Sequence, residues 1–526
     1  MKNNFIKYAF LGGLFFFALE ATAQQFAKGV VYEDSNKNGK RDKKERVLPN
    51  VGVSNGRDVV QTNDKGEYKL PVGEDNILFV IKPSGYTTPV DANNLPKYYY
   101  IHNPVGAPDL KYKGVSATGS LPKSIDFALH AVEEKDDFKI LVFGDPQVYN
   151  LTQVEYLKKG VVEELKGVQG YEFGISLGDL VGNNPDLFSP YINVMKDIGV
   201  PWYQVMGNHD INFDVPNDEL SDVSFKAHFG PNNYSFNKGK VHFIVLDDVI
   251  YNGEGASRQY IGGLREDQLE FVENDLKFVP KDHLVVICVH IPFVNHGKHA
   301  IRENDNKRLF AALKDFPNTL SMSAHTHYQT QIFIDKSFGW QQDTPHHHYN
   351  VGTTSGNWYS GEIGDNGVPP ATMADGTKKG YAVVTFKGNK YELDYHVSNA
   401  PKDYKMEIFL PKVTEKRKNS KASMYVNYFL GGVKDTIDYR VNNGKWVLMN
   451  HTETFDPYLL QEVLRWDTSK ELLKGDRPND PNMSTHIWKA AVPSDLPVGT
   501  HTIEFRVRDM FGRTSITTRT YEVAKN

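Results

Sequence analysis

Cysteine is almost absent from this sequence, because Cys288 is the only one among 526 residues. A single cysteine excludes an intrachain disulfide, so hydrophobic cores must supply the stability of the chain. Cys288 lies in the apolar run LVVICVH. We expect it to be a small buried hydrophobe within a strand.

The sequence also has no excess of basic residues. Its 60 Lys and Arg residues are outnumbered by 65 Asp and Glu residues, which gives a formal net charge of −5. This balance carries no signature of nucleic-acid binding. With 40% hydrophobic and 24% charged residues, the composition is that of an ordinary soluble globular protein. The length predicts about two to four domains.

Runs long enough to cross a membrane are missing as well. The apolar stretch Tyr8–Leu19 is shorter than the run of about 20 residues that a spanning helix needs. Lysines precede it, and the small-x-small sequence ATA follows at residues 21–23. These features predict a signal peptide over residues 1–23 and a mature chain without a transmembrane segment. We therefore expect an exported bacterial protein that is periplasmic, secreted or located at the cell surface.

The rest of the chain divides into three regions by pattern. Residues 24–133 hold short β-type runs broken by Gly, Asn, Asp and Pro, which predicts a small β-sandwich, with a hairpin turn at residues 63–66. Residues 134–398 alternate apolar strands with helical patterns, which predicts a layered α/β domain. Residues 399–526 alternate apolar and polar positions, and we expect a β-rich domain there.

Five short polar motifs follow strand-like runs in the middle region. Loops after successive strands converge at one edge of a sheet, so these motifs can meet in space. Their carboxylate, amide and imidazole groups favour Mn, Fe or Zn, and two such ions can clamp a phosphate and activate a water. The motifs are GDPQ at 144–147, GD at 178–179, GNHD at 207–210, VH at 289–290 and AHTH at 324–327.

In this order the five motifs closely resemble those of the calcineurin-like metallophosphoesterases, whose pattern is D-x-H, GD, GNH(D/E), H and GHxH. The resemblance implies a mixed α/β fold, with a four-layer α/β/β/α domain flanked by two β-rich, sandwich-like domains. It also implies a hydrolase that acts on phosphate mono- or diesters of small molecules, lipids or glycans. A different class remains open, namely a catalytically weak or inactive protein that binds surfaces or carbohydrates through its β-sandwiches.

The resemblance assigns a role to each motif residue. His209 would act near the leaving-group oxygen, and Asp210 would orient it. The implied reaction is in-line attack on phosphorus by a hydroxide bound to two metal ions. Asp145 and His327 would bind the first metal, Asp179 would bridge, and Asn208, His290 and His325 would bind the second.

Two positions depart from the family pattern. Ala324 stands where glycine is usual, which is a mild change. Gln147 stands in the histidine position of the first motif, and its amide oxygen is a weaker donor for Zn than imidazole is. The D-P-Q variant is associated with a subgroup of the superfamily, and the other motif positions are intact. We therefore favour an active enzyme in which Gln147 is a possible metal ligand.

A polar segment in the first region matches the spacing of a calcium loop, with Gly39 at the sixth position. The alternative is a polar hairpin rich in lysine. The flanking strands resemble those of the B-type repeats of bacterial surface adhesins, in which such a loop would be structural. The candidate calcium residues are Asp34, Asn36, Asn38, Lys40, Asp42 and Glu45.

Three aromatic or histidine features lie outside the five motifs. Trp358 lies in a Ser-Gly-x-Trp segment that borders the active site in similar exported proteins, and it could stack on a substrate ring or pack in the core. Trp488 is expected in a core. His346–His348 has no second ligand cluster, so we expect a surface loop there. The sequence gives no indication of an oligomeric state.

Overall fold

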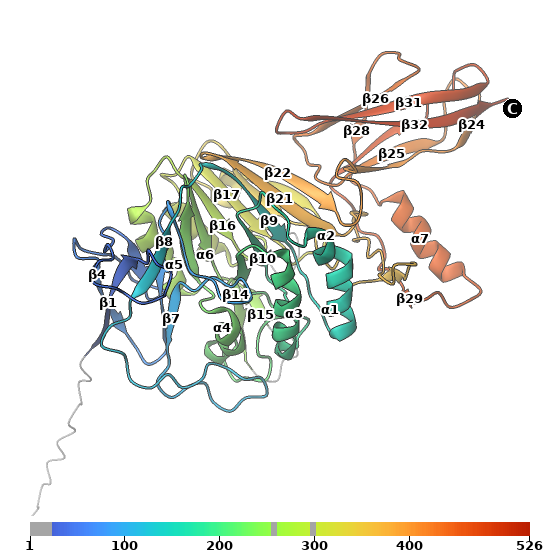
Figure 1. Ribbon diagram of the computed structural model, residues 1–526. Helices are drawn as coiled ribbons and strands as arrows, with labels where there is room; N and C mark the ends of the chain where they lie inside the picture. Colours follow the sequence, from blue (N-terminus) through green and yellow to red (C-terminus); the bar gives the residue numbers. More distant parts are fainter. Residues whose placement is uncertain (1–23, 254–259, 295–300, 526) are drawn as a thin grey trace, which may run out of the picture.

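The computed structural model describes residues 24–253, 260–294 and 301–525, and the predicted signal peptide lies outside them. Figure 1 shows a central α/β body with β-rich regions at either end of the chain. Within the described ranges, no helix is both long and apolar enough to cross a membrane.

The N-terminal region consists of two four-stranded sheets, in the orders β4-β1-β8-β6 and β3-β2-β5-β7. Strand β1 pairs antiparallel with β4 and parallel with β8. The strands are β1 (Gln25–Glu33), β2 (Gly52–Ser54), β3 (Val59–Gln61), β4 (Glu67–Val72), β5 (Asn76–Ile81), β6 (Tyr86–Thr87), β7 (Tyr99–His102) and β8 (Phe127–Ala131).

The turn at residues 63–66 is present, but the prediction that it closes a hairpin is wrong. The backbone N–H of Gly66 donates to the carbonyl of Asn63 at 2.8 Å. However, β3 before the turn and β4 after it belong to different sheets. The turn therefore carries the chain from one sheet to the other, a distinction that local turn residues do not encode.

The central region contains two larger sheets. A five-stranded sheet has the order β11-β10-β9-β21-β22, and a six-stranded sheet has the order β12-β13-β16-β17-β19-β18. The first comprises β9 (Asp137–Phe143), β10 (Phe173–Leu177), β11 (Trp202–Val205), β21 (Gly380–Lys387) and β22 (Lys390–Val397). The second comprises β12 (Tyr234–Lys238), β13 (Val241–Val245), β16 (Leu284–Cys288), β17 (Asn318–Ser323), β18 (Thr330–Ile334) and β19 (His346–Asn350).

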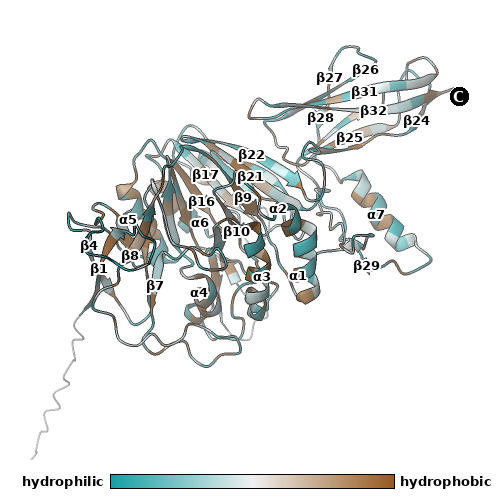
Figure 2. Ribbon diagram, in the orientation of Figure 1, coloured by the Kyte–Doolittle hydropathy of each residue, from teal (hydrophilic) through white to brown (hydrophobic). Residues whose placement is uncertain are grey.

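Aromatic rings join the inner faces of these two sheets. Phe243 of β13 contacts Phe173 of β10 and Phe386 of β21, with ring centroids 5.4 and 5.5 Å apart. Phe236 of β12 also lies 5.4 Å from Phe173. Figure 2 shows hydrophobic stretches along these central strands. The buried Cys288 of β16 belongs to this core, as predicted.

Helices cover the outer face of each central sheet. Tyr191 of α3 lies 2.8 Å from Ser176 of β10 through their hydroxyls, and Asp275 of α5 lies 2.9 Å from His242 of β13. This arrangement confirms the predicted four-layer α/β/β/α fold. The helices of the central region are α1 (Leu151–Leu157), α2 (Glu163–Leu165), α3 (Phe188–Met195), α4 (Val223–Phe229), α5 (Glu266–Asp275) and α6 (Glu303–Ala312). Short strands are β14 (Val249–Tyr251), β15 (Tyr260–Gly262) and β20 (Gly361–Glu362).

The C-terminal region has a four-stranded sheet, β23-β25-β30-β28, and a five-stranded sheet, β24-β32-β31-β26-β27. Trp488 on β30 is 2% exposed, so its predicted place in a core is confirmed. The strands are β23 (Met406–Phe409), β24 (Val413–Glu415), β25 (Ser423–Tyr428), β26 (Thr436–Val441), β27 (Val447–Leu448), β28 (Asn450–His451), β30 (Ile487–Ala491), β31 (Gly499–Arg508) and β32 (Thr514–Ala524).

One helix in this region was not predicted. Helix α7 (Pro457–Thr468) begins after Asp456, whose carboxylate accepts from the backbone N–H of Leu459. Buried Leu459 and Val463 are four residues apart, which is the spacing of one helix face. Two apolar positions are too few to make this spacing visible in the sequence. Beyond α7, strand β29 (Gly475–Asp476) pairs with β20 of the central region. Figure 1 shows α7 and β29 reaching back beside the central body.

Candidate metal centre

The motif residues lie where neighbouring strands end. Asp145 follows β9, Asp179 follows β10 and Asn208 follows β11, and these strands are parallel. His290 and His325 follow β16 and β17, which are also parallel. Because the carboxyl ends of parallel strands share one edge, the two sheets bring the five motifs to a common site.

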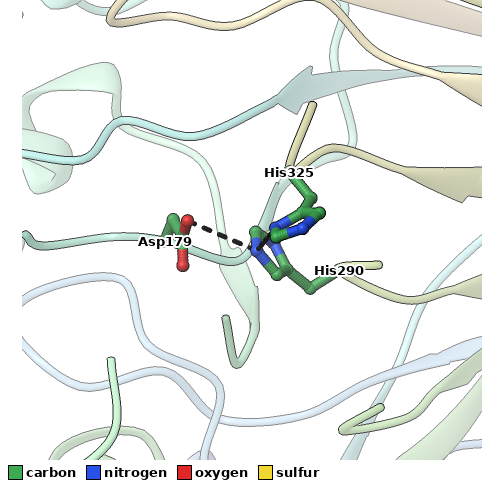
Figure 3. Close-up of side chains that lie close together, drawn as sticks. All are labelled: Asp179, His290 and His325. Carbon is green, nitrogen blue, oxygen red and sulfur yellow. Dashed lines mark hydrogen bonds and ion pairs between the residues drawn. The ribbon is translucent and has the colours of Figure 1, made fainter. Parts of the chain in front are cut away.

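Asp179, His290 and His325 form the centre of this site, as Figure 3 shows. One donor atom from each lies within 4.8 Å of the others. Nε2 of His290 is 3.3 Å from Oδ2 of Asp179 and 3.2 Å from Nδ1 of His325. Such a cluster of carboxylate and imidazole donors has the spacing of a metal site.

The remaining predicted ligands surround this cluster. The amide oxygen of Asn208 lies 2.9 Å from Nε2 of His290. Both oxygens of Asp145 accept from the backbone N–H of His325, at 3.1 and 3.0 Å. Gln147 approaches Asp179, with its Nε2 3.4 Å from Oδ2. The loops after β9, β10, β11, β16 and β17 are therefore held together through the site.

The backbone at the site is strained in a consistent way. Residues other than glycine rarely adopt positive φ, and such positions cluster at functional sites because the surrounding structure must hold them there. Five of the predicted ligands have φ in this left-handed region: Asp145 at 36°, Gln147 at 37°, Asp179 at 49°, His325 at 69° and His327 at 58°.

Backbone carbonyls orient two of the imidazoles. Nδ1 of His290 lies 2.8 Å from the carbonyl of Leu177, and Nδ1 of His327 lies 3.0 Å from the carbonyl of Gly356. In a neutral ring, this contact places the proton on Nδ1 and leaves Nε2 as the donor to a metal. Both histidines therefore have the kind of backbone contact that orients metal-binding imidazoles in proteins.

The electrostatics of the centre favour a cation. Burial opposes a charge on His290, but the carboxylates of Asp179 and Asp145 outweigh it and raise the pKa of His290 to about 10. Burial acts in the opposite direction on Asp179, yet His290 and His209 hold the pKa of Asp179 below its usual value. A positive charge is thus stabilised at Nε2 of His290, where a metal ion can replace the proton.

The amide oxygen of Gln147 gives a separate test of fit. Gln147 is 1% exposed, and its Oε1 has no hydrogen-bond partner. A buried acceptor without a partner costs about 1–3 kcal/mol, so such an atom needs an explanation. Metal coordination supplies one, because an amide oxygen is a ligand for hard cations. The residues present therefore fit a two-metal site.

The predicted partner of His209 is not the observed one. Asp210 was expected to orient His209, but its carboxylate accepts from the backbone N–H groups of Gly207 at 2.9 Å and Val181 at 3.1 Å. It therefore braces the loops after β10 and β11. Nδ1 of His209 instead lies 2.6 Å from Oδ1 of Asn183. Asn183 was missed, although its position four residues after Asp179 placed it on a motif loop.

The prediction of a surface loop at His346–His348 is also wrong. These residues begin β19, which lies between β17 and β18, and all three are buried. Burial lowers the pKa of His346 and of His347 to about 3, so the rings are neutral. The sequence did not predict this strand, because three consecutive histidines form a polar run. Its burial depends on partners from neighbouring strands.

These partners form a continuous hydrogen-bonded chain. Ser321 lies between Nε2 of His346 and Nδ1 of His348, at 2.6 Å from each. The chain starts at Thr319, 2.8 Å from Nδ1 of His346, and continues from Nε2 of His348 to Ser323 at 2.8 Å. It ends at Asn350, which accepts from Ser323 and donates to the carbonyl of Tyr328 and the hydroxyl of Thr326.

The donors and acceptors along this hydrogen-bonded chain can be assigned in only one way. The amide N–H groups of Asn350 donate to the loop, so its oxygen must accept the hydroxyl proton of Ser323. Ser323 must then accept from Nε2–H of His348, which leaves Nδ1 as an acceptor. The same logic assigns Nε2–H to His346. The carbonyl of Tyr328 thus fixes the tautomers of His346 and His348. The same hydrogen bond ties the loop of His325 and His327 to the sheet.

Trp358 lies at the rim of the centre. Its ring is stacked on His327 with centroids 4.2 Å apart, and it is 39% exposed. The alternative of a core tryptophan is therefore excluded. Like the ligands, Trp358 has a positive φ, 49°. One face of the indole supports a predicted ligand, and the residue is exposed enough to meet a substrate ring.

The candidate calcium residues also converge. Asp34, only 2% exposed, accepts from the backbone N–H groups of Asn38 at 3.1 Å and Gly39 at 2.7 Å. Glu45 accepts from Ser35 at 3.1 Å and Asp42 at 2.9 Å. The segment between them contains no strand, and antiparallel contacts flank it, since Tyr32 bridges to Val47 and the backbone N–H of Glu33 donates to the carbonyl of Arg46 at 2.8 Å. Asn36 and Asn38 donate to Asp42, and the backbone of Lys40 donates to Asn38.

Three family profiles match the chain in order along its length. Residues 35–112 match the N-terminal domain of calcineurin-like phosphoesterases, residues 138–329 match the calcineurin-like phosphoesterase domain, and residues 348–514 match the C-terminal domain. The chain belongs to the calcineurin-like phosphoesterases. The enzymes of this family are hydrolases of phosphoric ester bonds, and a chain with all three parts has the three-domain architecture expected from the sequence.

Similar solved structures are distant from this calcineurin-like phosphoesterase. The purple acid phosphatase PPD1 from yellow lupin (Lupinus luteus) seeds is 12% identical, with a TM-score of 0.35, and the match covers 71% of this chain and 66% of that one. GAP50, the anchor in the inner membrane complex of Plasmodium, is 13% identical, with a TM-score of 0.30 and coverage of 50% and 84%. A comparison with curated proteins gave no match.

Proposed function

We propose that the chain is an exported, dimetal phosphoesterase that hydrolyses phosphate mono- or diesters. The observation that carries this proposal is the convergence of Asp179, His290 and His325, with donor atoms within 4.8 Å of one another, at the edge where five family motifs meet. Export rests on the sequence of residues 1–23 alone.

Two metal ions, when bound, supply a Lewis acid for the phosphate and an activated water. Asp145, Gln147, Asp179 and His327 would hold the first ion, and Asp179, Asn208, His290 and His325 the second. The chain itself positions His209, whose backbone N–H donates to Asp179 at 2.8 Å and whose ring is held by Asn183. His209 would protonate the leaving-group oxygen as the ester bond breaks.

Carboxylate, amide and imidazole donors without thiolate favour Mn, Fe or Zn as the metals. The test is to load the purified chain with each metal and to measure metal content together with hydrolysis of p-nitrophenyl phosphate and bis-p-nitrophenyl phosphate. We expect about two ions per chain and turnover of at least one ester. A folded chain that binds no metal and hydrolyses neither ester would instead support the binding-protein alternative.

Trp358 is proposed as a substrate contact. Its ring extends from the metal ligand His327 to solvent, so a planar group attached to the phosphate can stack on it. Exchange of Trp358 for alanine should raise KM for aryl phosphates more than for glycerol phosphate. Equal changes for both substrates would show that the indole does not recognise a ring.

We further propose that the loop from Asp34 to Glu45 binds one calcium ion and stabilises the N-terminal sandwich. Its support is the spacing of oxygen donors around Gly39, which has φ of 70° at the sixth position. Thermal unfolding with Ca²⁺ and with EGTA tests this proposal, with Glu45→Gln as the comparison. A Ca²⁺-dependent rise in Tm that Glu45→Gln removes is expected, while equal Tm values with Ca²⁺ and EGTA would contradict it.

A further inference from the structure

The C-terminal region contacts the loop that carries Trp358. Strand β29 pairs with β20, where Gly475 lies opposite Glu362. Nδ2 of Asn479 donates to Oδ1 of Asn357 at 3.0 Å, directly beside Trp358 in the sequence. The pairing requires close approach, because a Cβ on Gly475 would lie 2.3 Å from the carbonyl oxygen of Gly361.

A salt bridge supports the same contact from α7. Arg465 lies 2.6 Å from Glu362. Arg477 in turn pairs with Asp467 at 2.6 Å and Asp480 at 2.8 Å, which braces the segment that presents Asn479. Exposed ion pairs contribute little stability individually. Their value here is geometric, because they fix the segment from β29 to Asn479 against the Trp358 loop.

A second, buried contact reaches the segment that follows His327. Nε2 of His486, which is 0% exposed, lies 2.9 Å from Oδ2 of Asp375. The same oxygen accepts from the backbone N–H of Gln329 at 2.8 Å. Asn427 adds a hydrogen bond to the carbonyl of Asp375 at 3.0 Å. A C-terminal histidine is therefore linked through one carboxylate to the backbone two residues after His327.

The two contacts meet at one ligand. His327 is stacked on Trp358, whose loop is held by Asn479, and it is followed by Gln329, which is held through Asp375 by His486. Both elements have backbone strain to maintain, since His327 and Trp358 have φ of 58° and 49°. A strained loop keeps its conformation only when its surroundings determine it.

We infer that the C-terminal region completes the substrate side of the metal centre, with Asn479 and His486 as positioning residues for Trp358 and His327. This inference rests on the proposed phosphoesterase function and assigns part of its substrate selectivity to a region outside the metal-ligand motifs. The region is then required for recognition of the group next to the phosphate, beyond any role in attachment or stability.

The test is a double-mutant cycle in the full chain with metal bound, using Asn479→Ala and Trp358→Ala. Asn482→Ala is the matched control, because Asn482 is an exposed neighbour in the same segment. Loss of one hydrogen bond should raise KM for p-nitrophenyl phosphate about threefold to tenfold in Asn479→Ala, with kcat and metal content within about twofold of the parent. In the Trp358→Ala background, Asn479→Ala should add no further increase.

The inference for Asn479 would be overturned if the increases in KM from the two substitutions multiply in the double variant. It would also be overturned if Asn479→Ala and Asn482→Ala have the same KM. For His486, exchange to Phe should lower the affinity for metal, and exchange to Gln should restore it in part because its amide can reach Asp375. If His486→Phe unfolds the chain, the Gln variant alone decides: an affinity between those of the parent and of the ligand deletion His327→Ala is expected, and an affinity equal to the parent's would contradict the role.

Hydrogen exchange separates this inference from the proposed function. In the parent chain the backbone N–H of Asn357 donates to the carbonyl of Ala371 at 3.1 Å, and that of Tyr359 donates to Ser355 at 3.0 Å. Asn479→Ala should speed exchange at these amides about tenfold, and Asn482→Ala should not. Absent turnover in the parent would refute the phosphoesterase proposal, whereas unchanged exchange in Asn479→Ala would refute the positioning role.

Discussion

The histidines of the metal centre and those of strand β19 lie in different surroundings. His290, His325 and His327 converge with carboxylates at the ends of strands, whereas His346–His348 form the first part of strand β19. Carboxylates raise the pKa of His290 to about 10, and burial among hydroxyl partners lowers that of His346 to about 3. The neighbours of an imidazole, more than the imidazole itself, determine whether it attracts a cation.

Removing a carboxylate at the metal centre should give the largest effect. Asp179→Asn takes away the charge that both proposed metal sites would share, so we expect kcat for p-nitrophenyl phosphate to fall about a thousandfold or more. Metal content by mass spectrometry should fall with it. Asp315→Asn, a change at an exposed aspartate, should alter neither quantity. Near-parent activity in Asp179→Asn would remove the main difference between the two histidine groups.

Substitution of Gln147 should have the second largest effect. Gln147→Ala deletes the buried Oε1 that has no partner, and metal affinity at one of two sites should fall about tenfold to a hundredfold. Gln147→His should keep measurable hydrolysis and shift the preference toward Zn, because imidazole is the better Zn ligand. Competition titrations with Mn and Zn measure both changes. If Gln147→Ala leaves metal content and rate unchanged, Gln147 is not a ligand.

Asn183 should have a smaller effect that is confined to the reaction. Asn183→Ala removes the partner 2.6 Å from Nδ1 of His209, so kcat should fall about tenfold while metal content stays constant. Asn183→Asp keeps the acceptor oxygen and should recover most of the rate. A loss of equal size in Asn183→Asp would indicate that Asn183 shapes the loop and does not orient the ring.

The histidines of β19 should make the free energy of unfolding depend on pH. Unfolded histidine binds a proton below about pH 6.5, whereas the folded His347 binds one only near its pKa of about 3. The full contribution of neutral His347 to the free energy of unfolding should therefore be present above pH 6.5. That contribution should fall as the pH drops. Urea unfolding of His347→Phe should show a decline that is smaller by about 1.4 kcal/mol per pH unit. An unchanged pH slope would mean that His347 is protonated in the folded chain.

The sequence predicted the ligand loops well because each motif is short and follows a recognisable strand. Asp145, Asp179, Asn208, His290 and His325 meet through parallel strand order, which such patterns encode. The sequence did not predict contacts between distant segments. Asn479 with Asn357, His486 with Asp375 and the burial of His346–His348 depend on which strands become neighbours. Nor did it predict the partner of His209, because the carboxylate of Asp210 is taken up by the backbone of two loops.

The chain of alternating serine and histidine side chains also specifies how β17 and β19 align. Ser321 lies opposite His348 and Ser323 opposite Asn350 in this parallel pair. Because side chains alternate between faces, a slip of β19 by one residue would turn His346 and His348 to the other face and leave both serines without partners. These polar side chains therefore specify the register of the two strands within an apolar sheet, and through Asn350 they also hold Thr326 and Tyr328 on either side of His327.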